Sequence, residues 1–259
     1  MFPELQEIID LDLTSLRNGN LILMSENGLD ASFLIHHFLS YFLKNKCNVC
    51  FVGFCQTFGH YNTVAQKLGT NLNVAKQNGQ LVFIEALKTT TQNLVTPSNN
   101  PFDCIDKELS IQSIYELIKS AVENLQQSSK TPTLILFDNL SIMQYVGVET
   151  LHIVSLVQYL RTCKTFENTT IAAMVTNDQN IDDEDASLLW KHLCHHSDLT
   201  IEANCLPSGY LKEVHGEIIA KWKDPLGLAK SARKPQSAQY RIKDKNVTFF
   251  AKGTSKMVL

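Results

Sequence analysis

Residues 21–42 of the chain read LILMSENGLDASFLIHHFLSYF. The stretch opens with a continuous apolar run at residues 21–24, which is typical of a strand covered on both faces. A helical stripe follows, formed by Leu34, Phe38, Tyr41 and Phe42. Asp30 or Ser32 is suited to cap the start of this helix. A buried strand, a short turn and an amphipathic helix in this order predict an α/β fold.

The same alternation continues along the chain. Further apolar runs of strand length lie at residues 49–54, 81–84, 134–137 and 171–175. Two more helical stripes consist of Ile111, Ile114, Tyr115, Ile118 and Val122, and of Leu151, Val154, Val157 and Leu160 with Ile153 beside them. Strands that alternate with helices predict right-handed crossovers and a parallel sheet.

The C-terminal part follows a different pattern. Strand-like runs at residues 199–201, 218–222, 240–242 and 247–251 have no long helix between them, and residues 243–246 form a turn between the last two. The prediction is therefore a mostly parallel central sheet flanked by helices, extended by an antiparallel C-terminal hairpin. With 259 residues, the chain fits a single domain spanning 1–259, with loops near 92–106 and 224–239.

Composition narrows the class of protein. Hydrophobic residues make up 44% of the chain, as in globular domains, and no apolar run is long enough for a membrane helix. The N-terminus is acidic, unlike a signal peptide. Seven scattered cysteines do not form a disulfide framework. We expect a soluble protein with reduced thiols, in the cytoplasm or the nucleus.

The phosphate-binding loop of nucleotide-hydrolysing α/β proteins has the pattern G-x-x-x-x-G-K-[ST]. At the first strand-to-helix turn, Ser25 and Asp30 stand where the glycines belong and Ala31 stands where the lysine belongs, so that only Ser32 matches. Glu26 and Asp30 add negative charge where a triphosphate would lie. This turn has the position of a phosphate-binding loop without its chemistry.

Two further positions concern nucleotide chemistry. Asp138 follows the apolar run 134–137, as does the Mg²⁺-binding aspartate of such proteins, although an aspartate there also commonly caps the next turn. Residues 55–57 follow an early strand, where RecA-type ATPases carry a catalytic glutamate, and they contain no acid. No Asp or Glu occurs from residue 31 to residue 84, so a carboxylate base is not supplied there. We therefore assign no catalytic residue and expect no cofactor.

Several segments resemble the Elongator complex protein 6 family in the same order along the chain: residues 32–40, 66–69, 79–85, 214–217 and 248–253. The resemblance implies a RecA-like fold without nucleotide motifs. It also implies assembly with the related fourth and fifth Elongator subunits in a six-chain ring that docks on the catalytic subcomplex, binds tRNA and supports carboxymethyl-type modification of the wobble uridine. The alternatives are a divergent NTPase and an inactive RecA paralogue acting on DNA.

Charge is unevenly distributed. From residue 207 to the end, 11 Lys and Arg face 4 Asp and Glu, which fits either an anionic partner or a solvated surface. The candidates for RNA contact are Lys221, Lys223, Lys230, Arg233 and Lys234. Trp222 and Tyr240 flank them and either stack on bases or belong to the core, the second interpretation being favoured slightly.

The remaining motifs have ordinary explanations. Cys47 and Cys50 form a C-x-x-C that would need partners such as His192, Cys194, His195 and His196 to bind zinc. Packing of these two cysteines in the core is the favoured interpretation, and no metal is expected. His36 and His37 lie on the first predicted helix, where structural histidines are far more common than ligands.

Overall fold

The computed structural model describes residues 1–13, 16, 19–86, 111–129, 131–163, 166, 168–178, 184–206, 209, 211, 213–223, 234–243 and 245–252. The strands are β1 (Asn20–Asn27), β2 (Asn48–Gly53), β3 (Leu81–Glu85), β4 (Thr133–Phe137), β5 (Thr169–Thr176), β6 (Leu199–Asn204), β7 (Gly216–Trp222), β8 (Gln236–Lys243) and β9 (Asn246–Phe250). The helices are α1 (Pro3–Ile9), α2 (Ser32–Lys44), α3 (Phe58–Lys67), α4 (Leu72–Gln77), α6 (Ile111–Ser128), α7 (Ser141–Tyr145), α8 (Thr150–Thr162) and α9 (Glu184–His196).

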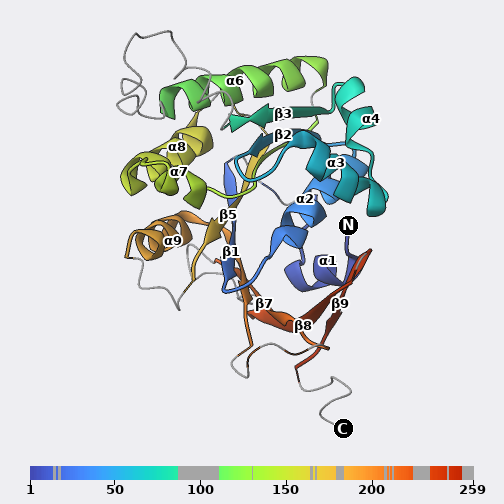
Figure 1. Ribbon diagram of the computed structural model, residues 1–259. Coiled ribbons are helices and arrows are strands. Elements are labelled where there is room, and N and C mark those ends of the chain that lie inside the picture. Colours follow the sequence, from blue (N-terminus) through green and yellow to red (C-terminus); the bar gives the residue numbers. More distant parts are fainter. Residues whose placement is uncertain are drawn as a thin grey trace, which may run out of the picture.

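The nine strands form one sheet in the order β3-β2-β4-β5-β1-β6-β7-β8-β9 (Figure 1). Every pairing from β3 to β6 is parallel, and the pairings of β6 with β7, β7 with β8 and β8 with β9 are antiparallel. Strand β5 therefore separates β1 from β4. Because the three strands are parallel, their C-terminal ends lie next to one another, and we call this row of strand ends the sheet edge.

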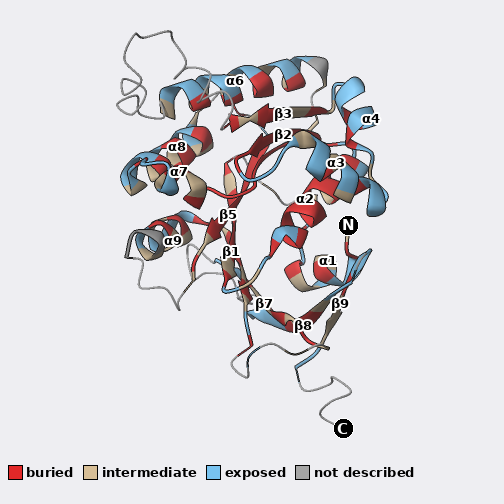
Figure 2. Cartoon of the chain, in the orientation of Figure 1, coloured by how far each residue is buried: buried red, intermediate tan, exposed pale blue. Residues whose placement is uncertain are grey.

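Helices cover the parallel part of the sheet on both faces, with buried residues concentrated between the layers (Figure 2). On β1, Ile22 and Met24 join the core under α1, α2 and α3, whereas Leu21 and Leu23 join the core under α6, α8 and α9. Successive side chains of a strand point to opposite faces. A segment buried on both sides therefore favours apolar residues at successive positions, which is why the run at 21–24 is continuous.

Helix α1, near the N-terminus, lies beside the C-terminal strands β8 and β9 (Figure 1). The indole N–H of Trp222 donates to the carbonyl of Ile9 at 2.7 Å, and the backbone N–H of Phe249 donates to Glu4 at 3.3 Å. Among the described residues, no helix has the length and apolar character needed to cross a bilayer.

The expected α/β architecture with an antiparallel C-terminal hairpin is confirmed, with several corrections of detail. The expected loop at 224–239 is too long, because residues 236–239 already pair with β7 as part of β8. The expected strands 49–54 and 247–251 end one residue early, at Gly53 and Phe250. Residues 92–106 and 224–233 lie outside the described part of the chain.

Two helix predictions are also corrected. Helix α2 begins after Ala31, which is its N-cap residue, but the carboxylate of Asp30 accepts from the N–H of Ser32 at the first helical position. On α8 the buried face consists of Ile153, Leu156, Val157 and Leu160, and Leu151 is 61% exposed. The true stripe is offset from the expected one because positions 153, 156, 157 and 160 share one face of a helix with 3.6 residues per turn.

Candidate functional site

The turn from β1 into α2 brings carboxylates to the helix N-terminus. Strand β1 continues to Asn27, so Ser25 and Glu26 belong to the strand and not to a loop. The N–H of Ala31 donates to Oε2 of Glu26 at 3.4 Å, and the N–H of Ser32 donates to Oδ1 of Asp30 at 2.7 Å. These first backbone donors of a helix are the groups with which a phosphate-binding loop holds its ligand. Here side chains of the chain itself accept from them.

The other oxygen of Glu26, Oε1, accepts hydrogen bonds from residues at the ends of β4 and β5. Nδ2 of Asn139, just after β4, donates to Oε1 of Glu26 at 3.1 Å and to Oγ1 of Thr176 at 2.9 Å. The hydroxyl of Thr176, at the end of β5, donates to the same Glu26 oxygen at 3.2 Å. Burial raises the pKa of Glu26, hydrogen bonds from Ala31 and Thr176 offset part of this rise, and the charge of Asp30 adds to it. The network closes this sheet edge with protein groups.

Asp138 lies next to this network and is fully engaged. Its Oδ1 accepts from the N–H groups of Phe54 and Asn139, and its Oδ2 accepts from the N–H of Cys55, each at 2.8 Å. The hydroxyl of Tyr61 donates to Oδ2 at 2.7 Å. The side chain is buried, and burial raises the pKa of its carboxyl although these four donors oppose the rise. Asp138 therefore connects the turn after β2 to the end of β4 through hydrogen bonds.

The turn at Cys55, Gln56 and Thr57 offers no group for activating water. Thr57 caps α3 by accepting from the N–H of His60 at 3.4 Å. Burial, followed by the charge of Asp138, raises the pKa of the Cys55 thiol to about 12, so the thiol stays protonated at neutral pH. A protonated thiol and a hydroxyl that caps a helix are poor general bases.

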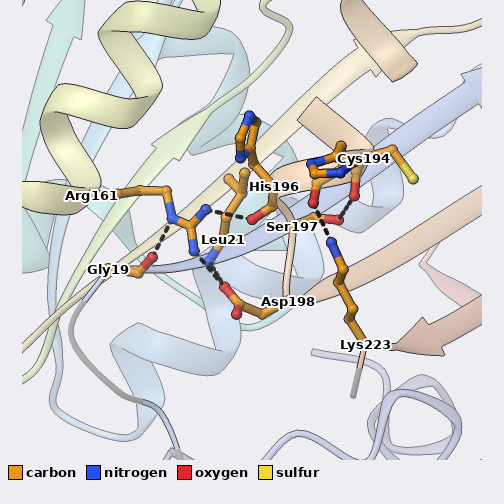
Figure 3. A network of polar contacts seen from close by, with 9 residues as sticks. Gly19, Leu21, Arg161, Cys194, His196, Ser197, Asp198 and Lys223 are labelled. Carbon is orange, nitrogen blue, oxygen red and sulfur yellow. Dashed lines mark hydrogen bonds and ion pairs between the residues drawn. The ribbon is translucent and has the colours of Figure 1, made fainter. Parts of the chain in front are cut away.

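The lysines proposed for RNA contact differ in their surroundings. Nζ of Lys221, on β7, pairs with Glu202 on β6 at 2.8 Å, and Nζ of Lys223 donates to the carbonyl of His195 at the end of α9 (Figure 3). Lys234 is exposed just before β8. Lys230 and Arg233 lie outside the described residues.

The flanking aromatic residues are part of the core. Tyr240 is fully buried, with its ring centroid 4.9 Å from that of Phe33. Trp222 packs against the same core. The idea that Tyr240 stacks on a base is therefore wrong, because its ring faces α2 inside the protein.

Sequence reasoning missed a polar junction at the opposite edge of the sheet, where β1 and β6 begin (Figure 3). Arg161 of α8 donates from Nε to the carbonyl of Gly19 at 2.7 Å and pairs with Asp198 at 3.1 Å. Oδ2 of Asp198 also accepts from the N–H of Leu21 at 2.8 Å. Gly19 has a φ of +73°, and a Cβ there would lie 2.4 Å from the carbonyl oxygen of Arg161. The only sequence signal for this junction was a glycine before an apolar run.

Histidine and cysteine side chains are structural where they are buried. Nδ1 of His37 accepts from the N–H of Phe2 at 3.2 Å, so Nε2 carries the proton toward Oε1 of Gln6, 3.3 Å away. Burial lowers the pKa of His37 to about 3 and that of His36 to about 4. Burial raises the pKa of Cys50 to about 12. Within the described ranges, no group of three or more His, Cys, Asp or Glu side chains is placed to hold a metal.

The sequence of the chain is similar to those of known proteins. Residues 2–244 match the family model described as Elongation complex protein 6. Curated relatives named Elongator complex protein 6 align over the full length of both chains: the proteins of Xenopus tropicalis, Rattus norvegicus and Homo sapiens are 37%, 36% and 32% identical to this chain.

Proposed function

The chain belongs to the Elongator complex protein 6 family, and from this premise we propose that it is a non-catalytic subunit of the Elongator complex. The observation that carries this proposal is the closed edge at the ends of β1, β5 and β4. Glu26 and Asp30 accept from the helix donors that a nucleotide phosphate would need. A triphosphate would have to displace these carboxylates and then lie beside their charges, which is unfavourable in a partly buried site.

Asp138 supports the same conclusion. A magnesium-binding aspartate needs a free lone pair directed at the ion. Each oxygen of Asp138 instead accepts two hydrogen bonds from protein donors. Binding a metal here would leave buried N–H groups unsatisfied, at a cost of about 1–3 kcal/mol for each group.

Without a catalytic site, the chain would act by assembling with partner subunits. We infer that the chain joins the related fourth and fifth Elongator subunits in a six-chain RecA-like ring, which docks on the catalytic subcomplex and supports wobble-uridine modification of tRNA. Three exposed side chains on α7 and α8 favour protein contacts: Tyr145, Leu151 and Tyr159 are 59%, 61% and 67% exposed. Large apolar and aromatic groups of this kind are typical of the centres of protein interfaces.

tRNA contact is the second part of the proposal. Lys221, Lys223 and Lys234 lie near the two ends of residues 224–233, which contain Lys230 and Arg233. Basic side chains bind nucleic acid through its phosphates, and such binding weakens as salt rises. Charge reversal at Lys230, Arg233 and Lys234 should weaken tRNA binding by the assembled ring at about 100 mM salt while leaving assembly intact. Unchanged affinity would remove these residues from the proposal.

Nucleotide binding separates this function from that of a divergent NTPase. Calorimetric titration of the full-length chain with Mg-ATP should give no saturable heat at millimolar nucleotide. Saturable binding of Mg-ATP by the unmodified chain would favour an NTPase. Equal affinity for tRNA and for duplex DNA would favour the DNA-acting paralogue.

A further inference from the structure

The last turn of α9 is rich in histidine. Residues 191–196 read KHLCHH, in which Leu193 is buried, Lys191, His195 and His196 are exposed and His192 is half-buried. Residues three and four apart share a helix face. His192, His195 and His196 therefore form one group on the outer side of α9, and the rings of His195 and His196 lie 5.2 Å apart.

The end of a helix is ordinarily a poor place for an anion, because its carbonyl oxygens carry partial negative charge. Here three successive carbonyls already accept hydrogen bonds (Figure 3). The hydroxyl of Ser197 donates to Cys194, Lys223 donates to His195 and Arg161 donates to His196. Two of these donors are cations, so the usual negative end of the helix is covered by positive charge.

The surrounding charges come from three neighbouring elements. Cations are supplied by Arg161 on α8 and by Lys221 and Lys223 at the end of β7, and carboxylates are supplied by Asp198 and Glu202. Each carboxylate is paired with one cation, Asp198 with Arg161 and Glu202 with Lys221. Burial lowers the pKa of His196, as do the nearby charges of His195, Arg161, Lys223 and His192. The contacts of Arg161 and Lys223 with the carbonyls of His196 and His195 bring these cations close to the histidines, where they would attract an anion.

The chemistry of this surface distinguishes between two classes of partner. Protein interfaces depend on large apolar anchors. Among the described residues, no exposed large hydrophobic side chain lies on β7 or in the last turn of α9, and the exposed Leu188 of α9 lies one turn earlier. A surface that is cationic and polar without such anchors matches a nucleic-acid phosphate backbone.

We propose that His192, His195 and His196 form one RNA-phosphate-binding surface with Lys221 and Lys223, so that RNA binds more tightly as these histidines gain protons. The proposal rests on the tRNA contact proposed above and extends it from β7 onto α9. Lys223 connects the two, since it contacts the end of α9 and directly precedes residues 224–233. Histidine is the side chain whose charge changes between about pH 5 and pH 8.

The test compares RNA affinity across pH. Fluorescence anisotropy of labelled bulk tRNA would be measured with the full-length chain, alone and in the ring, at pH 5.5, 6.5 and 7.5 and constant salt. We expect affinity about fivefold higher at pH 5.5 than at pH 7.5, from charge interactions at near-surface distances. The variant carrying His192→Gln, His195→Gln and His196→Gln should lose this dependence. His60→Gln, which changes an exposed histidine on α3, is the matched control and should retain it.

The outcomes separate the two proposals. Binding that is independent of pH in the unmodified chain, or equally dependent on pH in the triple variant, would overturn the role of α9 and leave the lysine contacts intact. Absence of tRNA binding at every pH, for the chain and for the ring, would overturn both. Circular dichroism of each variant at each pH checks that the protein stays folded.

Discussion

The side-chain amide of Asn139 donates a 3.1 Å hydrogen bond to Glu26, which lies 113 positions away in the sequence. Asn139 follows β4, Glu26 is the next-to-last residue of β1, and Thr176 on the intervening β5 bonds to both. This contact defines the sheet edge at which an active α/β nucleotide enzyme would bind its ligand. The edge is instead held together by side chains of the protein.

The first prediction concerns the stability of this edge. Glu26→Ala removes the acceptor of the Ala31 N–H, of the Thr176 hydroxyl and of one N–H of the Asn139 amide, so the free energy of unfolding should fall by about 1–3 kcal/mol. Urea denaturation measures the change. Glu149→Ala is the matched control: this exposed glutamate precedes α8 without a side-chain cap bond, and its loss should change stability by less than about 0.5 kcal/mol. Equal effects of the two substitutions would show that the network does not stabilise the fold.

The second prediction separates a structural from a nucleotide role for Asp138. Asp138→Ala leaves four donors unsatisfied, and it should lower the unfolding free energy by about 3 kcal/mol or more. Tyr61→Phe removes only one of these donors and should cost about 1 kcal/mol. An Asp138→Ala protein as stable as the unmodified chain would contradict a structural role for Asp138 between β2 and β4.

The third prediction isolates a backbone clash. Gly19→Ala would place a Cβ 2.4 Å from the Arg161 carbonyl oxygen at a positive φ. Gly69→Ala has a similar φ of +77° but meets nothing within 4 Å. The control should lose about 1 kcal/mol from the left-handed backbone alone, and Gly19→Ala should lose distinctly more. Similar losses at both positions in thermal or urea unfolding would argue against a tight junction at Gly19.

The fourth prediction follows from the buried histidines. The pKa values of His36 and His37 are lowered in the folded protein to about 4 and about 3, from an ordinary value near 6.5. Between pH 6.5 and the lowered pKa values, the unfolded chain binds more protons than the folded protein. The free energy of unfolding should therefore decrease as pH falls below about 6.5. Each histidine contributes up to about 1.4 kcal/mol per pH unit in that window.

Substitution tests this assignment. His37→Gln should be less stable than the unmodified chain at pH 7.5, because the packing of α1 on α2 is disturbed. Its stability should change less steeply between pH 6.5 and pH 5. An identical slope in urea titrations of both proteins would assign the acid sensitivity to other groups.

The fifth prediction concerns the missing lysine. Ala31→Lys restores one residue of a phosphate-binding loop but leaves Asp30 and Glu26 on the helix donors and supplies no base. We expect no ATP turnover above background in a phosphate-release assay. Turnover in this single variant would contradict the account of the closed edge.

The strands were predictable because burial on both faces makes most of their successive positions apolar. The runs at 21–24 and 134–137 therefore correspond to β1 and β4. The replaced glycines and lysine at 25–32 were also visible in the sequence. The hydrogen bonds that take the place of the phosphate contacts could not be predicted from the sequence. The bond between Glu26 and Asn139 depends on the order β1-β5-β4 in the sheet, and strand order is a long-range property.

The junction around Arg161 illustrates the same limit. Arg161 and Asp198 are 37 positions apart, and nothing local connects them. The role of Tyr240 was likewise decided by packing, because α2 contributes Phe33 to the space above β8. The surface on α9 required a structure as well: the sequence showed a histidine cluster, but only the fold brings Lys223 to its end.

The central claim, a subunit that acts through assembly, is tested most directly by native mass spectrometry of this chain with the fourth and fifth Elongator subunits. The account predicts a mixed species of six chains that forms without added nucleotide. Failure of this chain to associate with either subunit, while those two still associate with each other, would contradict it.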